Sequence, residues 1–379
     1  MSKKDSSFQT SRRQFLLSSI GASVALGATK SFGLNYISPQ QNEQETRTLD
    51  EIYQAAIQEG GKLIIYAGGD FDGQQDSVKN AFKARFPEID ITIVVDYSKY
   101  HDVRLDNQYE TDTVVPDIMQ LQLLQDFERW KYLDRLKCYK PLGFDNIHPS
   151  LRDSDGAWMA VSIVAFSFVV DNYALGNSAP VSAEALANGI WKGNIASSYP
   201  NDDDAVEFLY KLYTEAYGWD WLAAMAEQDI AFKRGSHTPG VAIQQQEKLI
   251  GIGTSSGGPI YNPDTNLRWV LPETDPFMAW GQRAAILKCA KNPEAAKLYM
   301  NWMVSEEFQS QRGWPIRTDL TPLGGLSPIW DYPNAHFDEF PQFMRNRQEV
   351  ELWRQTFSLY FGEVQGAPSP GWLGLHPGA

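Results

Sequence analysis

Acidic and aromatic side chains stand where short apolar runs of this sequence end. Asp70 follows the run at residues 62–67, Tyr97 follows the run at residues 89–95, and an acidic cluster at residues 202–204 precedes a helical pattern. Carboxylate and phenol oxygens are hard donors that suit hard cations, whereas carboxylates combined with aromatic faces suit organic cations. The residue types and their positions therefore indicate a site that binds a cation.

Apolar runs alternate with helical patterns over the first part of the chain. Thr48 and Glu51 form a capping box that begins a helix, and strands are predicted at residues 62–67, 89–95 and 117–121. This alternation predicts a parallel sheet flanked by helices, in which ligands bind beyond the carboxyl ends of the strands. The loops at those ends supply five candidate ligand-binding residues: Gly69, Asp70, Tyr97, Gln120 and Gln122.

A second unit of the same kind is predicted further along the chain. The apolar run at residues 158–170 is long for one strand, so we expect it to cross into a second body, and residues 283–287 to carry the chain back. Acidic residues at a helix N-terminus usually cap free N–H groups and complement the helix dipole. We expect Asp202 to cap the helix and Asp203 or Asp204 to face the ligand.

A loop of small and hydroxyl-bearing residues follows the next predicted strand. Thr254, Ser255 and Ser256 lie in it, and Tyr261 comes close behind. Two interpretations stay open. The loop is a plain turn, or its N–H and hydroxyl donors hold a ligand, in which case they would suit an anion.

The composition disfavours several classes of function. A formal net charge of −14 disfavours nucleic acid as a partner, because like charges repel at long range. The sequence has no P-loop, CxxC or HExxH motif. We therefore expect no catalytic activity and no required cofactor. Cys138 and Cys289 are the only cysteines, and their spacing leaves a disulfide between them open.

The N-terminus is typical of an export signal. Residues 11–16 read Ser-Arg-Arg-Gln-Phe-Leu, and an uncharged apolar stretch at residues 15–29 follows the basic residues. That stretch is too short and too rich in Gly, Ala and Ser to span a membrane. The sequence predicts a twin-arginine signal peptide at residues 1–31, with export of the folded protein to the periplasm.

Several short motifs, each weak alone, occur in the order found in one known family. They are residues 116–118 (PDI), 156–172, 191–193 (WKG), 291–298 (KNPEAAKL) and 302–309 (WMVSEEFQ). Together they resemble the bacterial extracellular solute-binding proteins, the receptor subunits of ABC importers. The resemblance is greatest to the branch that includes the ferric-iron-binding receptors.

The resemblance implies a two-lobed α/β periplasmic-binding-protein fold, similar to type II, with a two-strand hinge and a ligand cleft between the lobes. On this basis lobe 1 comprises residues 47–160 and 276–316, and lobe 2 comprises residues 161–275. Residues 317–379 are expected as an extension that packs on lobe 1. Their helix at residues 347–361 carries an apolar stripe that would dock there or contact a permease. The protein would be a monomer that delivers its solute to an ABC permease in the inner membrane.

The ligand stays open between two kinds of cation. A ferric ion as transported ligand would take phenolate donors, and the candidates are the isolated Tyr199 and Tyr261. An organic cation would bind Asp70, Tyr97, Trp280 and the acidic cluster. Two other functions remain as alternatives: an exported glycosidase-like hydrolase, and a ligand-sensing partner of a signalling receptor.

Overall fold

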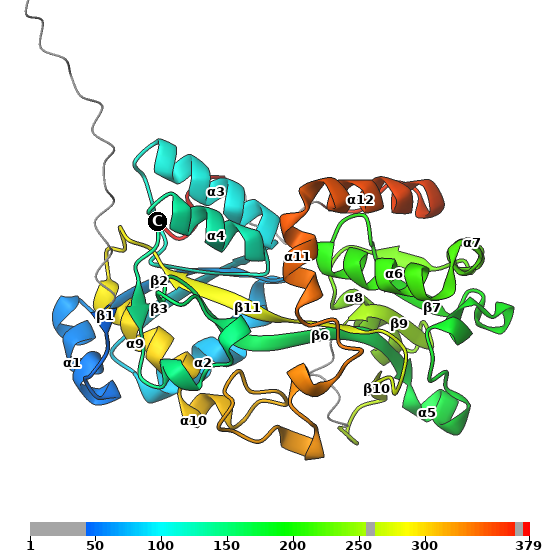
Figure 1. The fold of residues 1–379 in the computed structure, drawn as a ribbon, viewed down its shortest axis with the longest axis horizontal. Helices are drawn as coiled ribbons and strands as arrows, with labels where there is room; N and C mark the ends of the chain where they lie inside the picture. Colours follow the sequence, from blue (N-terminus) through cyan, green and yellow to red (C-terminus); the bar gives the residue numbers. More distant parts are fainter. Residues whose placement is uncertain (1–42, 255–261, 368–373) are drawn as a thin grey trace, which may run out of the picture. The chain divides into compact units, whose positions relative to one another are not determined.

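The computed structural model describes residues 43–254, 262–367 and 374–379, all within one compact unit, Gln41–Ala379. Its centre is a nine-stranded sheet in the order β3-β2-β4-β11-β6-β9-β7-β8, with β10 paired to β6 (Figure 1). The strands are β2 (Lys62–Gly68), β3 (Asp90–Asp96), β4 (Ile118–Leu121), β6 (Met159–Asp171), β7 (Ile195–Ser198), β8 (Ala231–Lys233), β9 (Ile250–Thr254), β10 (Leu267–Val270) and β11 (Met278–Ile286). A separate two-stranded sheet pairs β1 (Glu43–Gln44) with β5 (Tyr139–Lys140).

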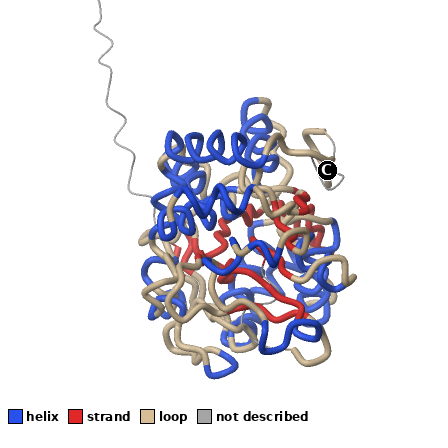
Figure 2. The backbone as a smooth tube through the Cα atoms, turned by 90° about the vertical axis from the view of Figure 1, so that its right-hand side faces the viewer, coloured by secondary structure: helices blue, strands red, loops and turns tan. Residues whose placement is uncertain are grey.

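Helices cover the sheet on both faces (Figure 2). They are α1 (Leu49–Glu59), α2 (Asp76–Arg85), α3 (Ser98–Glu110), α4 (Leu124–Tyr132), α5 (Asn172–Leu175), α6 (Asp204–Tyr217), α7 (Trp219–Ala226), α8 (Thr238–Gln244), α9 (Pro293–Val304), α10 (Glu306–Gln309), α11 (Glu339–Arg345) and α12 (Arg347–Phe361). We call the body built on β2, β3 and β4 the first lobe, and the body built on β7, β8 and β9 the second lobe.

The first lobe has the predicted parallel, helix-flanked sheet. β2 pairs in parallel with β3 and with β4. Successive residues of a strand point to opposite faces, so Ile65 and Ala67 pack with α1, α2 and α9, whereas Tyr66 packs with α3 and α4. The capping box of Thr48 and Glu51 is present at the start of α1.

Two long antiparallel strands connect the lobes, as expected for a two-strand hinge. β6 pairs with β11 over residues 159–166 and with β9 over residues 167–170. β11 continues alongside β4 through residues 283–286. Each of these strands is therefore shared by the two lobes, which explains the unusual length of the apolar run that predicted the crossover.

The second lobe repeats the pattern on a smaller scale. β7 pairs in parallel with β8 and β9, and β9 pairs antiparallel with β6. Its core is aromatic and aliphatic, with Phe208, Tyr210, Tyr213 and Trp221 among the buried side chains of α6 and α7. Cys138 is buried and Cys289 is exposed, and neither is in a disulfide.

The C-terminal segment contacts both lobes. Against the expectation from sequence, helix α12 packs on α6 and α7 of the second lobe rather than on the first, because Val350 and Phe357 of its apolar stripe complete the aromatic core there. Helix α11 contacts α4 of the first lobe. Further on, the Tyr66 hydroxyl donates to the Pro377 carbonyl at 2.8 Å, so the last residues lie on the first lobe. Among the described residues, no helix is long and apolar enough to span a bilayer.

Candidate ligand-binding cleft

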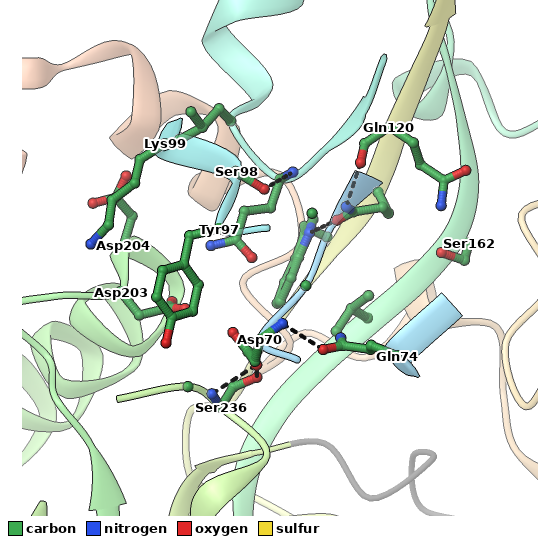
Figure 3. A pocket seen from close by; sticks show the side chains of 18 of the residues that line it. Asp70, Gln74, Tyr97, Ser98, Lys99, Gln120, Ser162, Asp203, Asp204 and Ser236 are labelled. Carbon is green, nitrogen blue, oxygen red and sulfur yellow. Dashed lines mark hydrogen bonds between the residues drawn. The ribbon is translucent and has the colours of Figure 1, made fainter. Parts of the chain in front are cut away.

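A cavity of about 1050 Å³ lies where the carboxyl ends of β2, β3 and β4 face the loops that follow β7 and β8. The hinge strands β6 and β11 form part of its wall through Ser162, Phe166, Trp280 and Gln282. Both lobes contribute to the lining, as a closing cleft requires. Figure 3 shows polar side chains from the two lobes pointing into the same space.

Asp70 forms a direct contact across this cleft. It lies in the loop after β2, and its Oδ2 accepts hydrogen bonds from the Ser236 backbone N–H at 2.9 Å and from the Ser236 hydroxyl at 2.6 Å (Figure 3). Ser236 follows β8 in the second lobe. The ring of the next residue, His237, packs against Phe71 with 5.0 Å between centroids. These contacts connect the two lobes at the edge of the cavity.

A second contact crosses the cleft at the start of α3. The Lys99 ammonium donates to the Asp202 carboxylate at 2.7 Å and to the Asp202 carbonyl at 3.0 Å. Arg234 approaches the same carboxylate at 3.5 Å. The charge of Asp202 is therefore neutralised by protein groups from both lobes.

Tyr97 lies between these two contacts and in acidic surroundings. Burial raises the pKa of its phenol, and the charges of Asp70, Asp202 and Asp203 raise that pKa further. The phenol therefore stays protonated at neutral pH and presents an O–H group and a π face to the cavity. Figure 3 shows Asp70, Tyr97 and Asp203 around one part of the cavity.

The three acidic residues at 202–204 have different roles from those expected from the sequence. Asp203, not Asp202, caps α6: its Oδ1 accepts from the N–H groups of Ala205 at 2.8 Å and Val206 at 3.1 Å. The sequence prediction was one residue out, because adjacent acids before a helix look alike as caps. Burial, and then the charge of Asp70, raise the pKa of Asp203 to about 7. Asp203 thus lines the cavity as a carboxyl group that is only partly ionised at neutral pH.

Asp204 is neutralised by the C-terminal helix. The Arg354 guanidinium binds its carboxylate at 2.8 Å, and that of Arg347 lies 3.6 Å away. Both arginines line the cavity, and neither was predicted from the sequence as a site residue. They lie seven positions apart, which places both on one face of α12 and could be recognised from the sequence. Nothing in the sequence showed that this face would contact α6.

The remaining predicted cavity residues form the wall on the first lobe and hinge. Gly69, Gln120, Gln122 and Trp280 all line the cavity. A Cβ atom on Gly69 would lie 2.5 Å from Val95 Cγ1, so the close approach of the loop to β3 requires glycine. Trp280 Nε1 donates to Gln282 Oε1 at 3.2 Å. These residues therefore form the part of the cavity wall next to the hinge strands.

Several predicted residues lie elsewhere. Tyr199, proposed as a metal ligand, is not part of the cavity lining; its ring stacks on Phe232 with 5.2 Å between centroids. Thr254 is buried at the end of β9, away from the cavity lining, and its carbonyl accepts from Trp269 Nε1. Ser255, Ser256 and Tyr261 lie outside the described residues. Within the described ranges, no three His, Cys, Asp or Glu side chains come together as metal ligands would.

A cleft between two α/β lobes joined by two strands defines the class of two-lobed solute-binding proteins. Residues 115–312 match the family model of the bacterial extracellular solute-binding proteins, and the chain belongs to that family. It is therefore a solute-binding receptor: members of this family bind small ligands outside the cytoplasm and work with ABC permeases. No curated protein matches the sequence.

Solved structures support the same fold. Iron-bound HitA from Pseudomonas aeruginosa has a TM-score of 0.59 and 17% identity, over 78% of this chain and 99% of its own. AfuA from Actinobacillus pleuropneumoniae, a periplasmic binding protein with bound fructose 6-phosphate, has a TM-score of 0.61 and 18% identity, over 80% and 99% of the two chains. The ferric binding protein from Campylobacter jejuni has a TM-score of 0.56 and 18% identity, over 78% and 99%.

Proposed function

We propose that this receptor is exported by the twin-arginine pathway to the periplasm, where as a monomer it captures a small cationic solute by cleft closure and delivers it unchanged to an ABC permease. The observation that carries the proposal is the group of Asp70, Tyr97 and Asp203 at one part of the cavity. We place lobe 1 at residues 47–160 and 276–316 and lobe 2 at residues 161–275.

An organic cation fits this part of the cavity best. The raised pKa of Tyr97 keeps its phenol neutral, and the π face of a neutral phenol attracts an ammonium group. Asp70 and the ionised fraction of Asp203 supply the countercharge. An ammonium group therefore gains a carboxylate contact and a ring contact together, without the need to deprotonate the phenol.

A ferric ion is the second candidate. The structures from Pseudomonas and Campylobacter are those of an iron-bound protein and a ferric binding protein. Tyr97 and Asp70 would offer hard oxygen donors, and a bound trivalent ion would itself favour the phenolate. Tyr97 would then replace Tyr199 as the phenolate ligand, because Tyr199 does not line the cavity.

Native mass spectrometry with metal analysis of protein purified from its own host tests this proposal directly. Binding at about 1,000 times Kd stabilises the folded state by about 4 kcal/mol, so a thermal-shift screen of ferric citrate, putrescine, spermidine and thiamine should give one clear response. Flat responses to all of them, with nothing carried through purification, would contradict the cationic-solute proposal.

Two substitutions at one position separate the candidates. Tyr97→Phe keeps the aromatic face but removes the oxygen donor, so it should abolish ferric binding and leave binding of an organic cation nearly unchanged. Tyr97→Leu removes the ring as well and should weaken both. Stoichiometric binding with release of the unchanged solute would support a receptor without catalysis; turnover of the solute would contradict it.

A further inference from the structure

The cationic side chains that line the cavity differ in whether a carboxylate neutralises them. Lys99 is paired with Asp202, Arg347 and Arg354 are paired with Asp204, and Arg129 lies within 3.0 Å of Asp126 and closer still to Asp102 and Asp106. Arg312 differs from them. Among the described residues no carboxylate is paired with its guanidinium, although it lines the same cavity.

The guanidinium of Arg312 packs against an aromatic ring, and no carboxylate in the described part of the chain serves as its counter-ion. Its guanidinium carbon lies 3.9 Å from the centroid of Phe308, and its buried Nε–H has no hydrogen-bond partner among the described residues. Burial lowers the pKa of this guanidinium, because the surrounding protein replaces water without supplying a negative charge. A partly buried, unpaired charge is unfavourable until an anion neutralises it.

Two further donors line the same cavity as Arg312. Its charge acts on the phenol of the buried Tyr299, so the two groups are close. The Tyr299 hydroxyl donates to Gln120 Oε1 at 2.9 Å, which turns the amide nitrogen of Gln120 away from Tyr299. Neither that nitrogen nor the Ser162 hydroxyl is hydrogen-bonded to any described residue, and both groups line the cavity (Figure 3).

We propose that Arg312, Gln120 and Ser162 form an oxyanion subsite, so that the captured solute carries a carboxylate or phosphate group. Arg312 would supply a planar fork of N–H donors, and the amide and hydroxyl groups would complete the set around the oxygens. This inference extends the proposed function. Because Asp70, Tyr97 and Asp203 lie in the same cavity, the solute class becomes a small zwitterion, with its cationic group at the acidic part and its anionic group at Arg312.

Simple anions test the subsite without knowledge of the natural solute. Inorganic phosphate and acetate are titrated into the protein by calorimetry at low ionic strength, where screening is weak. We expect saturable binding of at least one of them, and the tighter of the two shows whether the group is a phosphate or a carboxylate. Arg312→Gln should weaken that binding at least about tenfold, because a charged hydrogen bond is lost. Arg312→Lys, which keeps the charge but not the fork, should retain part of it.

Arg347→Gln is the matched control. It removes the same charge from the same cavity, but that charge is already shared with Asp204, so anion binding should stay within about twofold of wild type. Melting temperatures of all variants are measured to establish folding. Absence of saturable anion binding by the wild type, or equal losses in Arg312→Gln and Arg347→Gln, would overturn the subsite.

Putrescine and ethanolamine serve as cation probes in the same experiment. Binding of a cation probe without binding of phosphate or acetate would refute the anion subsite and support the proposed function. Binding of an anion through Arg312 without binding of any cation probe would support the subsite and count against the cationic-solute proposal. The failure of one proposal is therefore distinguishable from the failure of the other.

Discussion

Asp70 should control the balance between the closed and open forms of the cleft, because its carboxylate connects the two lobes directly through Ser236. Its carboxylate accepts two hydrogen bonds from Ser236, and its side chain is only 9% exposed, so water screens these bonds weakly. The substitution Asp70→Asn keeps the shape of the side chain and removes its charge. The two contacts would then become ordinary neutral hydrogen bonds.

The size of the effect follows from the change in bond type. A hydrogen bond to a charged group contributes about 1.5–3 kcal/mol and a neutral one about 0.5–1.5 kcal/mol, so each contact loses about 1 kcal/mol. Two such losses lower the ratio of closed to open molecules by about 30-fold, since about 1.4 kcal/mol corresponds to a factor of ten. The apparent affinity for a solute that binds the closed form should fall at least by the same factor as the closed fraction, and a cationic solute loses the countercharge of Asp70 in addition.

Fluorescence energy transfer between the lobes measures this ratio. Val103 on the first lobe is 53% exposed and Ile190 on the second is 69% exposed, so cysteines at these positions can carry the dyes. Cys289 is exposed and is first replaced by Ser, whereas the buried Cys138 stays. The ligand-free Asp70→Asn protein should show a larger population at long distance than the wild type.

Two controls decide whether the Ser236 contact is the cause. Asp72→Asn makes the same change two residues further on, at an exposed side chain, and should leave the distance distribution unchanged. In a double-mutant cycle, Asp70→Asn and Ser236→Ala should be coupled by about 1 kcal/mol, because each removes part of the same contact. Additive effects, or a distance distribution identical to wild type, would refute the reasoning.

Three further predictions concern the acidic cluster and the leader. Asp203→Ala should lower the free energy of unfolding by about 1 kcal/mol through loss of the α6 cap, whereas Asp203→Asn keeps an acceptor and should retain most of it; chemical denaturation measures both. Burial raises the pKa of Asp203 to about 7 from its usual value of 3.8, so its contribution to stability is present below pH 3.8 and is lost as the pH rises through about 7. Asp203→Asn should therefore gain stability relative to wild type between pH 4 and 7.5 in paired melts, and a constant difference would count against the raised pKa. Replacing Arg12 and Arg13 by Lys keeps the charge but should leave folded protein in the cytoplasm, as fractionation would show, and unchanged export would contradict the twin-arginine assignment.

The sequence predicted the elements whose signals are local. Strands β2, β3 and β4 were recognisable because strands buried on both faces are apolar throughout. The start of α1 was recognisable because Thr48 and Glu51 satisfy its free N–H groups reciprocally. The crossover at residues 158–170 was recognisable because a strand shared by two lobes must be long. Each of these inferences needed only a short window of sequence.

The site was only partly predictable, because its contacts join distant parts of the chain. Asp70 meets Ser236 across 166 positions, and Asp204 meets Arg354 across 150. Tyr199 was chosen because it follows a strand, but a strand end has two faces, and the ring turned to Phe232 on the side away from the cavity. No pattern in the sequence around Arg312, which follows the short helix α10, predicted a role in the site. Its proposed role depends on the lack of a paired carboxylate among the described residues, and this can be recognised only in the folded structure.

The pairing of charges around the cavity limits which of its side chains can respond to a solute. Asp202 is paired with Lys99, and Asp204 with Arg347 and Arg354, so these two carboxylates already have counter-ions and gain little from a cationic solute. Asp70 Oδ2 can lose the two hydrogen bonds from Ser236 only if the lobes separate. Asp203, whose carboxyl is partly protonated, and Arg312, whose guanidinium is paired with no carboxylate among the described residues, are then expected to gain more from a solute than these paired groups. A solute that ionises Asp203 and neutralises Arg312 would stabilise the closed cleft through both groups, whereas a solute that carries only one of the two charges would stabilise it through one.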